Sequence, residues 1–224
     1  MFPYTIIRSN RKTAVLRIRE GKVEFRIPHD LPQWEVDQFM HEKAPWILKT
    51  LKEQEAQAKK KEAFSIDYGS HIPLCGVLYK ITKGYGWKAD FDGVVFYMPR
   101  GLTPEDVKVT AINIYKSHAK AYIPDRVAVF AAQMGVVPSA IKINNAMKRW
   151  GSCTSEKNLN FSWRLIMTER SCIDYVVVHE LAHLIEMNHS PRFWAVVAKI
   201  LPDYKERKQK LKDFQRRLND EDWT

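Results

Sequence analysis

Cysteine is scarce in this chain of 224 residues, which contains only three. Cys75, Cys153 and Cys172 are odd in number and widely spaced, whereas a disulfide framework needs cysteines in pairs. These cysteines therefore predict reduced thiols in a cytoplasmic protein.

Long apolar runs are missing as well. No stretch approaches the roughly 20 apolar residues that a membrane-spanning helix needs. Residues 1–20 lack the apolar segment and small-residue cleavage site of a signal peptide. With 45% hydrophobic and 28% charged residues, the composition indicates an ordinary globular protein without a membrane partner.

Positive charge, in contrast, is plentiful, with a formal net charge of +10. Such a charge attracts nucleic acid and other polyanions weakly and favours acidic substrates. However, much of it lies in Lys59–Lys61 and in residues 205–217, both of which have the composition of exposed helix surfaces. Since no RNA- or DNA-binding motif interleaves aromatic with basic residues, we favour the interpretation that most of these lysines solvate helices.

The first part of the chain predicts a β-rich region with inserted helices, residues 1–99. Residues 13–27 form two β-type runs around Glu20-Gly21, which is a hairpin pattern. A helical pattern follows in residues 30–53, where Pro45 is expected to begin a second helix because proline lacks a backbone donor. Residues 55–63 fit a linker or an exposed helix end, and short β-type runs fill residues 70–99.

The second part, residues 100–224, predicts helices packed on a small sheet. A helix is expected to begin at Thr103-Pro104, to kink or restart at Pro124, and to end at Gly135. Later segments have β-type or helical patterns: strands near 140–145 and 158–166, and helices at 171–187, 191–200 and 202–219. The predicted fold class is therefore α+β.

The segment with the clearest chemistry is His179-Glu180-Leu181-Ala182-His183, an H-E-x-x-H motif. Residues four apart lie on one helix face, so both imidazoles can reach one metal ion. Glu180 lies one position further round, where its carboxylate can act as a base on water. Chance explains the motif poorly, since this composition gives roughly 0.01 accidental matches.

A catalytic zinc site of this type needs a third protein ligand and an open position. His189 is the nearest histidine, and the turn that it requires is expected from Asn188 in a left-handed conformation. Ser190 and Pro191 then fit the cap and first residue of another helix. Glu186 is the alternative ligand, but it lies too close along the same helix to splay three ligands well, so we favour His189.

Other candidate residues have weaker support. Cys153 is a possible but disfavoured ligand, because hydrolytic zinc sites with two histidines more often add a histidine or a carboxylate. Lys148, Arg149 and Ser152 lie in an unusual polar and aromatic stretch just before an expected strand. They are predicted to contact the substrate or to orient the ligands. The remaining histidines have no partner at ligand spacing: His29, His41, His71 and His118.

Several of these segments together closely resemble the YgjP-like family of metal-dependent hydrolases. The matching segments are R-W-G-S-C (149–153), N-L-N-F-S-W-R-L (158–165), Y-V-V-V-H-E-L-A-H (175–183), N-H-S-P-R-F-W (188–194), R-K-T-A-V-L-R-I (11–18) and K-A-P-W-I (43–47). The resemblance implies a zincin-like C-terminal domain related to SprT-type minimal metallopeptidases. It also implies His179, His183 and His189 as ligands and Glu180 as base. The histidine spacing is similar to that of metzincins, but Glu186 occupies their glycine position and no methionine turn is evident.

The expected function is a zinc-dependent, metallopeptidase-like hydrolase that binds one Zn²⁺ or another divalent ion. Two alternatives stay open at this point. One is a nucleoside triphosphate pyrophosphohydrolase, for which the net charge and the Lys148-Arg149 pair would suit a polyphosphate. The other is a nucleic-acid-associated module with structural zinc, which an open coordination position beside Glu180 disfavours.

Overall fold

A computed structural model describes residues 2–223 of the chain. Residues 1 and 224, the outer ends of the two expected regions, lie outside the described residues. The described chain forms two compact units, one ending at Phe64 and including Asn219–Asp222, the other comprising Ser65–Leu218 and Trp223. The boundary expected between residues 99 and 100 thus lies inside the second unit, and the assignment of hydrolase chemistry to residues 100–224 stays a prediction.

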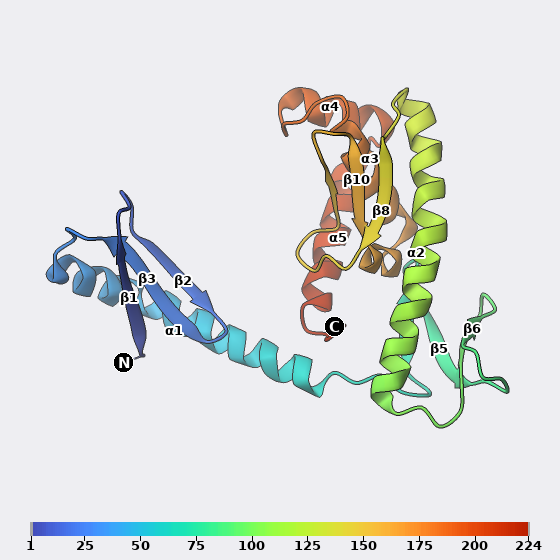
Figure 1. The fold of residues 1–224 in the computed structure, drawn as a ribbon, viewed down its shortest axis with the longest axis horizontal. Helices are drawn as coiled ribbons and strands as arrows, with labels where there is room; N and C mark the ends of the chain where they lie inside the picture. Colours follow the sequence, from blue (N-terminus) through green and yellow to red (C-terminus); the bar gives the residue numbers. More distant parts are fainter. Residues whose placement is uncertain (1, 224) are drawn as a thin grey trace. The chain divides into compact units, whose positions relative to one another are not determined.

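The first unit is a three-stranded sheet covered by one long helix (Figure 1). Its elements are β1 (Tyr4–Ser9), β2 (Val15–Arg19), β3 (Lys22–Pro28) and α1 (Gln33–Ala63). β3 is the central strand, parallel to β1 and antiparallel to β2. The predicted hairpin is confirmed: Glu20 and Gly21 both have positive φ, 50° and 72°, as a tight two-residue turn requires.

Pro45 does not begin a second helix, so that expectation is wrong. α1 continues through it from Gln33 to Ala63. Pro45 is exposed, whereas Met40 and Ile47 on either side of it are buried against the sheet. Packing of this apolar stripe holds the helix together despite the one backbone hydrogen bond that proline removes.

The second unit begins with a four-stranded sheet and a long helix. Strands β4 (His71–Leu74), β5 (Val77–Lys83), β6 (Asp90–Phe91) and β7 (Val95–Met98) are ordered β4-β5-β7-β6.

Helix α2 (Pro104–Met134) begins with the predicted Thr103 cap and ends at Gly135, whose φ is 67°. It does not restart at Pro124. A buried stripe at every fourth position stabilises it throughout: Val107, Ala111, Tyr115, Ala119, Ile123 and Val127.

A second, three-stranded sheet has the order β8-β10-β9. β8 (Ala140–Asn144) is parallel to β10 (Asn158–Ser162), and β9 (Gly151–Cys153) is antiparallel to it. The strand expected at residues 158–166 is shorter than predicted. It ends at Ser162, whose hydroxyl accepts from the Arg164 amide and so begins a 3-10 helix, η1 (Trp163–Met167).

Three helices complete the unit: α3 (Arg170–Ala182), α4 (Pro191–Ile200) and α5 (Tyr204–Leu218). α3 lies among its neighbours, packed against α2, α4, α5 and β9 (Figure 1). The combination of small sheets and packed helices confirms the predicted α+β class. Within residues 2–223, no helix has both the length and the apolar character needed to cross a bilayer.

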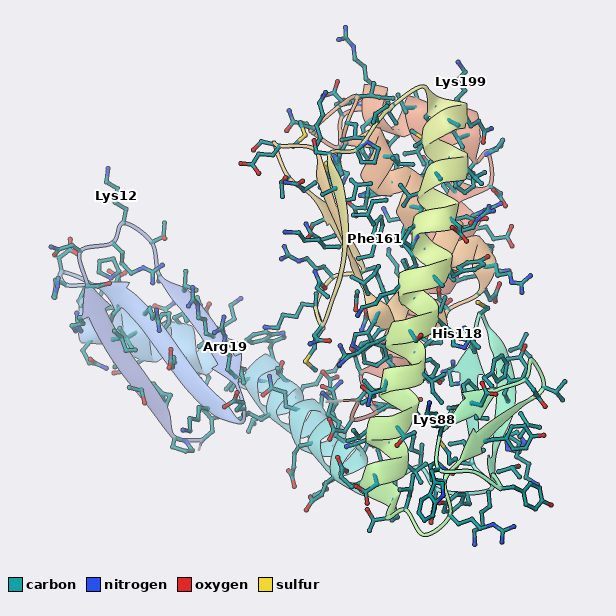
Figure 2. The ribbon with its side chains drawn as sticks, turned by 45° about the vertical axis from the view of Figure 1, so that its right-hand side comes forward. Lys12, Arg19, Lys88, His118, Phe161 and Lys199 are labelled. Carbon is teal, nitrogen blue, oxygen red and sulfur yellow. The ribbon has the colours of Figure 1, made fainter. Side chains whose placement is uncertain are left out.

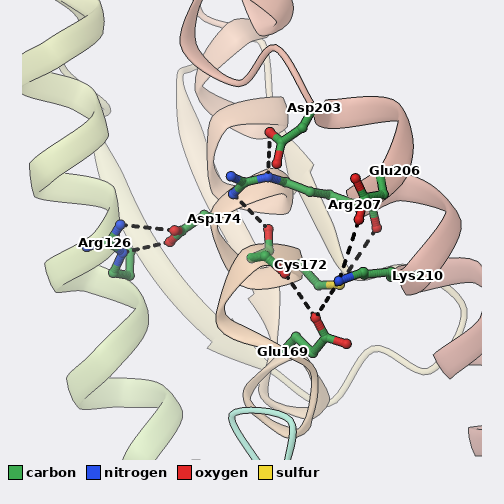
Figure 3. A network of polar contacts seen from close by, with 9 residues as sticks. Arg126, Glu169, Cys172, Asp174, Asp203, Glu206, Arg207 and Lys210 are labelled. Atoms are coloured by element: carbon green, nitrogen blue, oxygen red, sulfur yellow. Dashed lines mark hydrogen bonds and ion pairs between the residues drawn. The ribbon is translucent and has the colours of Figure 1, made fainter.

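Polar contacts fix α3 between two of these helices (Figure 3). From α2, Arg126 donates through Nε and Nη2 to the two carboxylate oxygens of Asp174, at 2.7 and 3.1 Å. From α5, Arg207 donates to the Ser171 carbonyl at 3.3 Å. A two-pronged guanidinium–carboxylate contact restricts geometry as well as adding free energy, so the position of α3 is set from both sides.

We expect Asp174→Asn to lower the free energy of unfolding by about 1–3 kcal/mol, because the charged and partly buried Arg126 loses its partner. Urea denaturation measures this change. Asp213→Asn is the matched control, since the Asp213–Arg216 pair is solvent-exposed and such pairs contribute about 0–1 kcal/mol. Equal losses in both variants would contradict a special contribution of the Arg126–Asp174 pair.

Candidate metal centre and catalytic cleft

Helix α3 carries the H-E-x-x-H motif at its C-terminal end. His179 and Glu180 lie in the last turns, and His183 is the C-cap residue with right-handed helical angles. The preceding residues Tyr175–Val178 are all buried, as predicted. The helix ends at Ala182 rather than at residue 187, and this early end lets the chain turn back towards the motif.

The structure brings His179, His183 and His189 together. One ligand-type nitrogen from each ring lies within 4.8 Å of the others. The Nε2 atoms of His179 and His189 are 3.0 Å apart, close to the roughly 3.3 Å that separates two nitrogens on one tetrahedral zinc ion. Neither Glu186 nor Cys153 belongs to this group among the described residues.

His189 reaches the group through a tight joint between α3 and α4. Ser190 caps α4, with its hydroxyl accepting from the Phe193 amide, and Pro191 is the first helical residue, both as predicted. The expected left-handed Asn188 is wrong, because Asn188 is not among the described residues with positive φ. Instead, short-range hydrogen bonds such as Leu184 N to Leu181 O make the turn, which needs no left-handed residue.

Two aromatic residues from the first turn of α4 pack against the histidines. The Phe193 ring is fully buried and lies 4.6–4.9 Å, centroid to centroid, from all three imidazoles. Trp194 lies 5.8 Å from the rings of His179 and His189. Rings packed in this way have few alternative rotamers, so α4 fixes the imidazoles in place. No motif or spacing in the sequence indicates that either residue belongs to the site.

Burial favours the neutral form of two of the imidazoles, those of His179 and His183. Burial, with smaller effects of neighbouring His183, His189 and Lys208, lowers the pKa of His179 to about 3. Burial also lowers the pKa of His183. Neutral imidazole is the form that binds a metal ion.

The Glu186 backbone sets the tautomer of His183. His183 Nδ1 lies 3.3 Å from the Glu186 carbonyl. Because a carbonyl can only accept, Nδ1 carries the proton and Nε2 keeps its lone pair. Glu186 thus contacts the cluster through its backbone. His179 Nδ1 is buried without a hydrogen-bond partner among the described residues, so this ring is positioned by packing instead.

Glu180 is a buried carboxyl group beside the histidines. It is 5% exposed, and burial raises its pKa to about 8, an effect that nearby Arg149 opposes. Gly151 of β9 makes room for it. A Cβ added at Gly151 would lie 2.6 Å from Glu180 Oε1 and 2.7 Å from Glu180 Cγ. No sequence spacing could reveal this contact, because it joins a strand to a helix.

We expect Gly151→Ala to lower kcat by about 100-fold, because a displacement of this size at a reacting group has such an effect. Metal content should be unchanged, since Gly151 does not lie in the histidine group. Steady-state kinetics with metal analysis measure both. Gly86→Ala is the matched control, because nothing lies within 4 Å of a Cβ there. Normal kcat in Gly151→Ala would contradict a fixed position for Glu180.

A cleft of about 510 Å³ opens onto His179 and Glu180. Its wall includes Lys148 and Trp150, and Tyr175 from the helix itself. Of the three residues predicted near the substrate, Lys148 lines the cleft, Arg149 acts electrostatically on Glu180, and Ser152 lies in β9 opposite Asn160. That stretch of the sequence therefore reaches the cleft, although Ser152 is not among its lining residues.

The other histidines lie apart from the cluster. Neither His29, His41 nor His71 belongs to a group of potential ligands in residues 2–223. His118 packs edge-on against Phe91, 5.6 Å between centroids, on the part of α2 beside the first sheet of the unit (Figure 2).

Comparison with known proteins gives a family. Residues 12–214 match the family described as "YgjP-like, metallopeptidase domain". The chain belongs to the YgjP-like family. It is therefore a metallopeptidase-like hydrolase, and the resemblance noted in the sequence is confirmed.

Comparison with curated proteins finds no match. Among solved structures, the chain is similar to the crystal structure of the metallopeptidase zymogen of Pyrococcus abyssi abylysin. That similarity covers 40% of this YgjP-like chain and 90% of the other, with 21% identity and a TM-score of 0.37.

Proposed function

We propose that this YgjP-like protein is a zinc-dependent peptidase in which His179, His183 and His189 hold the metal and Glu180 is the general base. One observation carries the proposal: three imidazoles converge beside a buried carboxyl group at the wall of a cleft. Each part has a known use in hydrolysis, and the parts lie where they can act together.

The residues present fit a zinc ion. All three donors are imidazole nitrogens, the pKa of His179 and of His183 is lowered by burial, and the Nε2 atoms of His179 and His189 lie 3.0 Å apart, a spacing that one zinc ion could bridge. Three protein ligands leave a coordination position open, as in catalytic rather than structural zinc sites. When bound, the ion supplies Lewis acidity that acidifies water and polarises a substrate carbonyl. Another divalent ion with affinity for nitrogen would fit the same donors.

Glu180 is proposed to accept a proton from the attacking water and later to donate it to the leaving amine. A group whose pKa lies near the working pH can do both. Burial raises the pKa of this carboxyl group, and Arg149 lowers it. The carboxyl group occupies the space that a side chain at position 151 would fill, so Gly151 leaves room for it beside β9. The chain therefore offers a buried base at the wall of the cleft.

Strand β9 offers a surface for an extended peptide. In the part of the chain that the structure describes, β9 pairs only with β10 and is an edge strand. It packs against α3 and carries Gly151, the residue in contact with Glu180. A peptide that adds a strand to such an edge gains backbone hydrogen bonds whatever its sequence, which would align its scissile bond along the cleft.

The test is hydrolysis by the zinc-loaded protein of casein, a peptide library and a nucleoside triphosphate panel. We expect peptide cleavage that stops on chelation and returns with zinc. Release of pyrophosphate or phosphate without peptide cleavage would support the phosphoanhydride alternative instead. DNA binding with neither activity would support a structural module, which the three-membered ligand group disfavours.

A further inference from the structure

One face of α5 forms a basic wall of the catalytic cleft. Lys208, Lys212 and Arg216 are spaced by four residues, and all three line the cleft with Leu211 and Gln215 of the same helix. Residues at this spacing share one helix face. Lys208 lines the same cleft as His179, and its Nζ lies over the Trp194 ring, which packs against His179, so this cation lies near the proposed reacting centre.

The ion pairs near the start of α5 involve cations that do not line the cleft (Figure 3). Arg207 pairs with Asp203 at 2.9 Å, and Lys210 pairs with Glu169 at 3.1 Å and with Glu206 at 3.7 Å. Asp203 and Glu206, at the start of α5, thus form ion pairs with cations that do not line the cleft.

The cleft cations, in contrast, have few acidic partners. Arg216 pairs with Asp213. Lys148, Lys208 and Lys212 form no ion pair within residues 2–223, and Lys208 Nζ lies 4.6 Å from the centroid of the Trp194 ring. Lysines that merely solvate a helix would not gather on the face turned to the cleft.

Glu180 is the one acidic residue among the described residues that line the cleft, and it is buried. A bound substrate would therefore meet several cations and an apolar floor that includes Val176 and Leu211. Unpaired cations beside an apolar surface attract an anionic group and repel a basic one.

We propose that the α5 wall makes the enzyme selective for acidic peptides, with Lys208 and Lys212 binding an Asp or Glu side chain near the cleaved bond. The proposal rests on the proposed peptidase function and adds its substrate class. It also assigns a role to part of the basic segment 205–217, whose composition alone favours lysines that solvate a helix.

The experiment uses two peptide sets that are identical except for Asp and Glu in one and Asn and Gln in the other. Cleavage is measured with zinc-loaded full-length protein, and binding with zinc-loaded Glu180→Gln protein. We expect acidic peptides to have about 10-fold higher kcat/KM and affinity, with the preference shrinking as salt increases. Lys208→Gln/Lys212→Gln should reduce the preference to about 2-fold or less.

Lys142→Gln/Lys199→Gln is the matched control. It removes the same charge from exposed positions outside the cleft, one of them Lys199 on α4 (Figure 2), and should keep the full preference. Lys212→Glu provides a gain-of-function variant, because Lys212 is exposed and its change should not disturb folding. It should shift the preference towards lysine-containing peptides.

Equal cleavage and equal binding of the two peptide sets would overturn the proposal while leaving the peptidase function intact. Nucleoside triphosphates that compete through Lys208 and Lys212, while peptides show no charge preference, would also overturn it. Failure of the peptidase function would appear differently, as absent peptide cleavage or as cleavage undiminished in Glu180→Gln.

Discussion

Glu180→Gln is expected to lower kcat for peptide hydrolysis by about 10²- to 10⁴-fold, the range that a general base contributes. The amide has nearly the shape of the carboxylate, so it fits the space between α3 and Gly151. It cannot accept a proton from water, and the proposed mechanism therefore loses its first step. The three histidines are unchanged, so metal content should equal that of the wild type.

The measurements are steady-state kinetics and metal analysis on the same preparation. Glu186→Gln is the matched control, since it removes a nearby carboxylate that lies outside the histidine group. We expect the control to keep both activity and metal. Undiminished activity in Glu180→Gln, with metal present, would refute the assignment of the base.

The part of the site that the sequence predicts is the part built by local geometry. His179, Glu180 and His183 follow from the period of one helix. Ser190 and Pro191 follow from the chemistry of helix beginnings, and they bring His189 within reach. Asn188 was mispredicted because several hydrogen-bonding patterns can end a helix, and residue type alone does not select among them.

Features that depend on distant parts of the chain were not predictable in the same way. Gly151 contacts Glu180 across a strand–helix interface, and nothing in either segment specifies the other. The spacing of Lys208 and Lys212 is visible in the sequence, but the surface that this helix face meets is not. Pro45 and Pro124 show the same limit, because tertiary packing keeps both helices continuous where local rules predict an interruption.

The third ligand gives the other large expected effect: His189→Ala should weaken zinc binding by at least about 100-fold. Loss of a residue that hydrogen-bonds to a metal ligand typically lowers metal affinity 10- to 100-fold. Loss of a ligand itself should lower it further. Activity should fall with zinc occupancy. His189 is exposed, so its truncation should leave the metal-free fold intact.

Competition with a zinc-binding dye measures the affinity, and circular dichroism of the metal-free protein checks the fold. His71→Ala is a matched control, because His71 is also exposed and lies outside the cluster.

Glu186→Gln separates the two candidates for the third ligand. The Glu186 side chain is not in the group of converging donors, while its backbone carbonyl accepts from His183 and survives the substitution. Zinc affinity should therefore fall in His189→Ala and persist in Glu186→Gln; the reverse would assign the third ligand to Glu186.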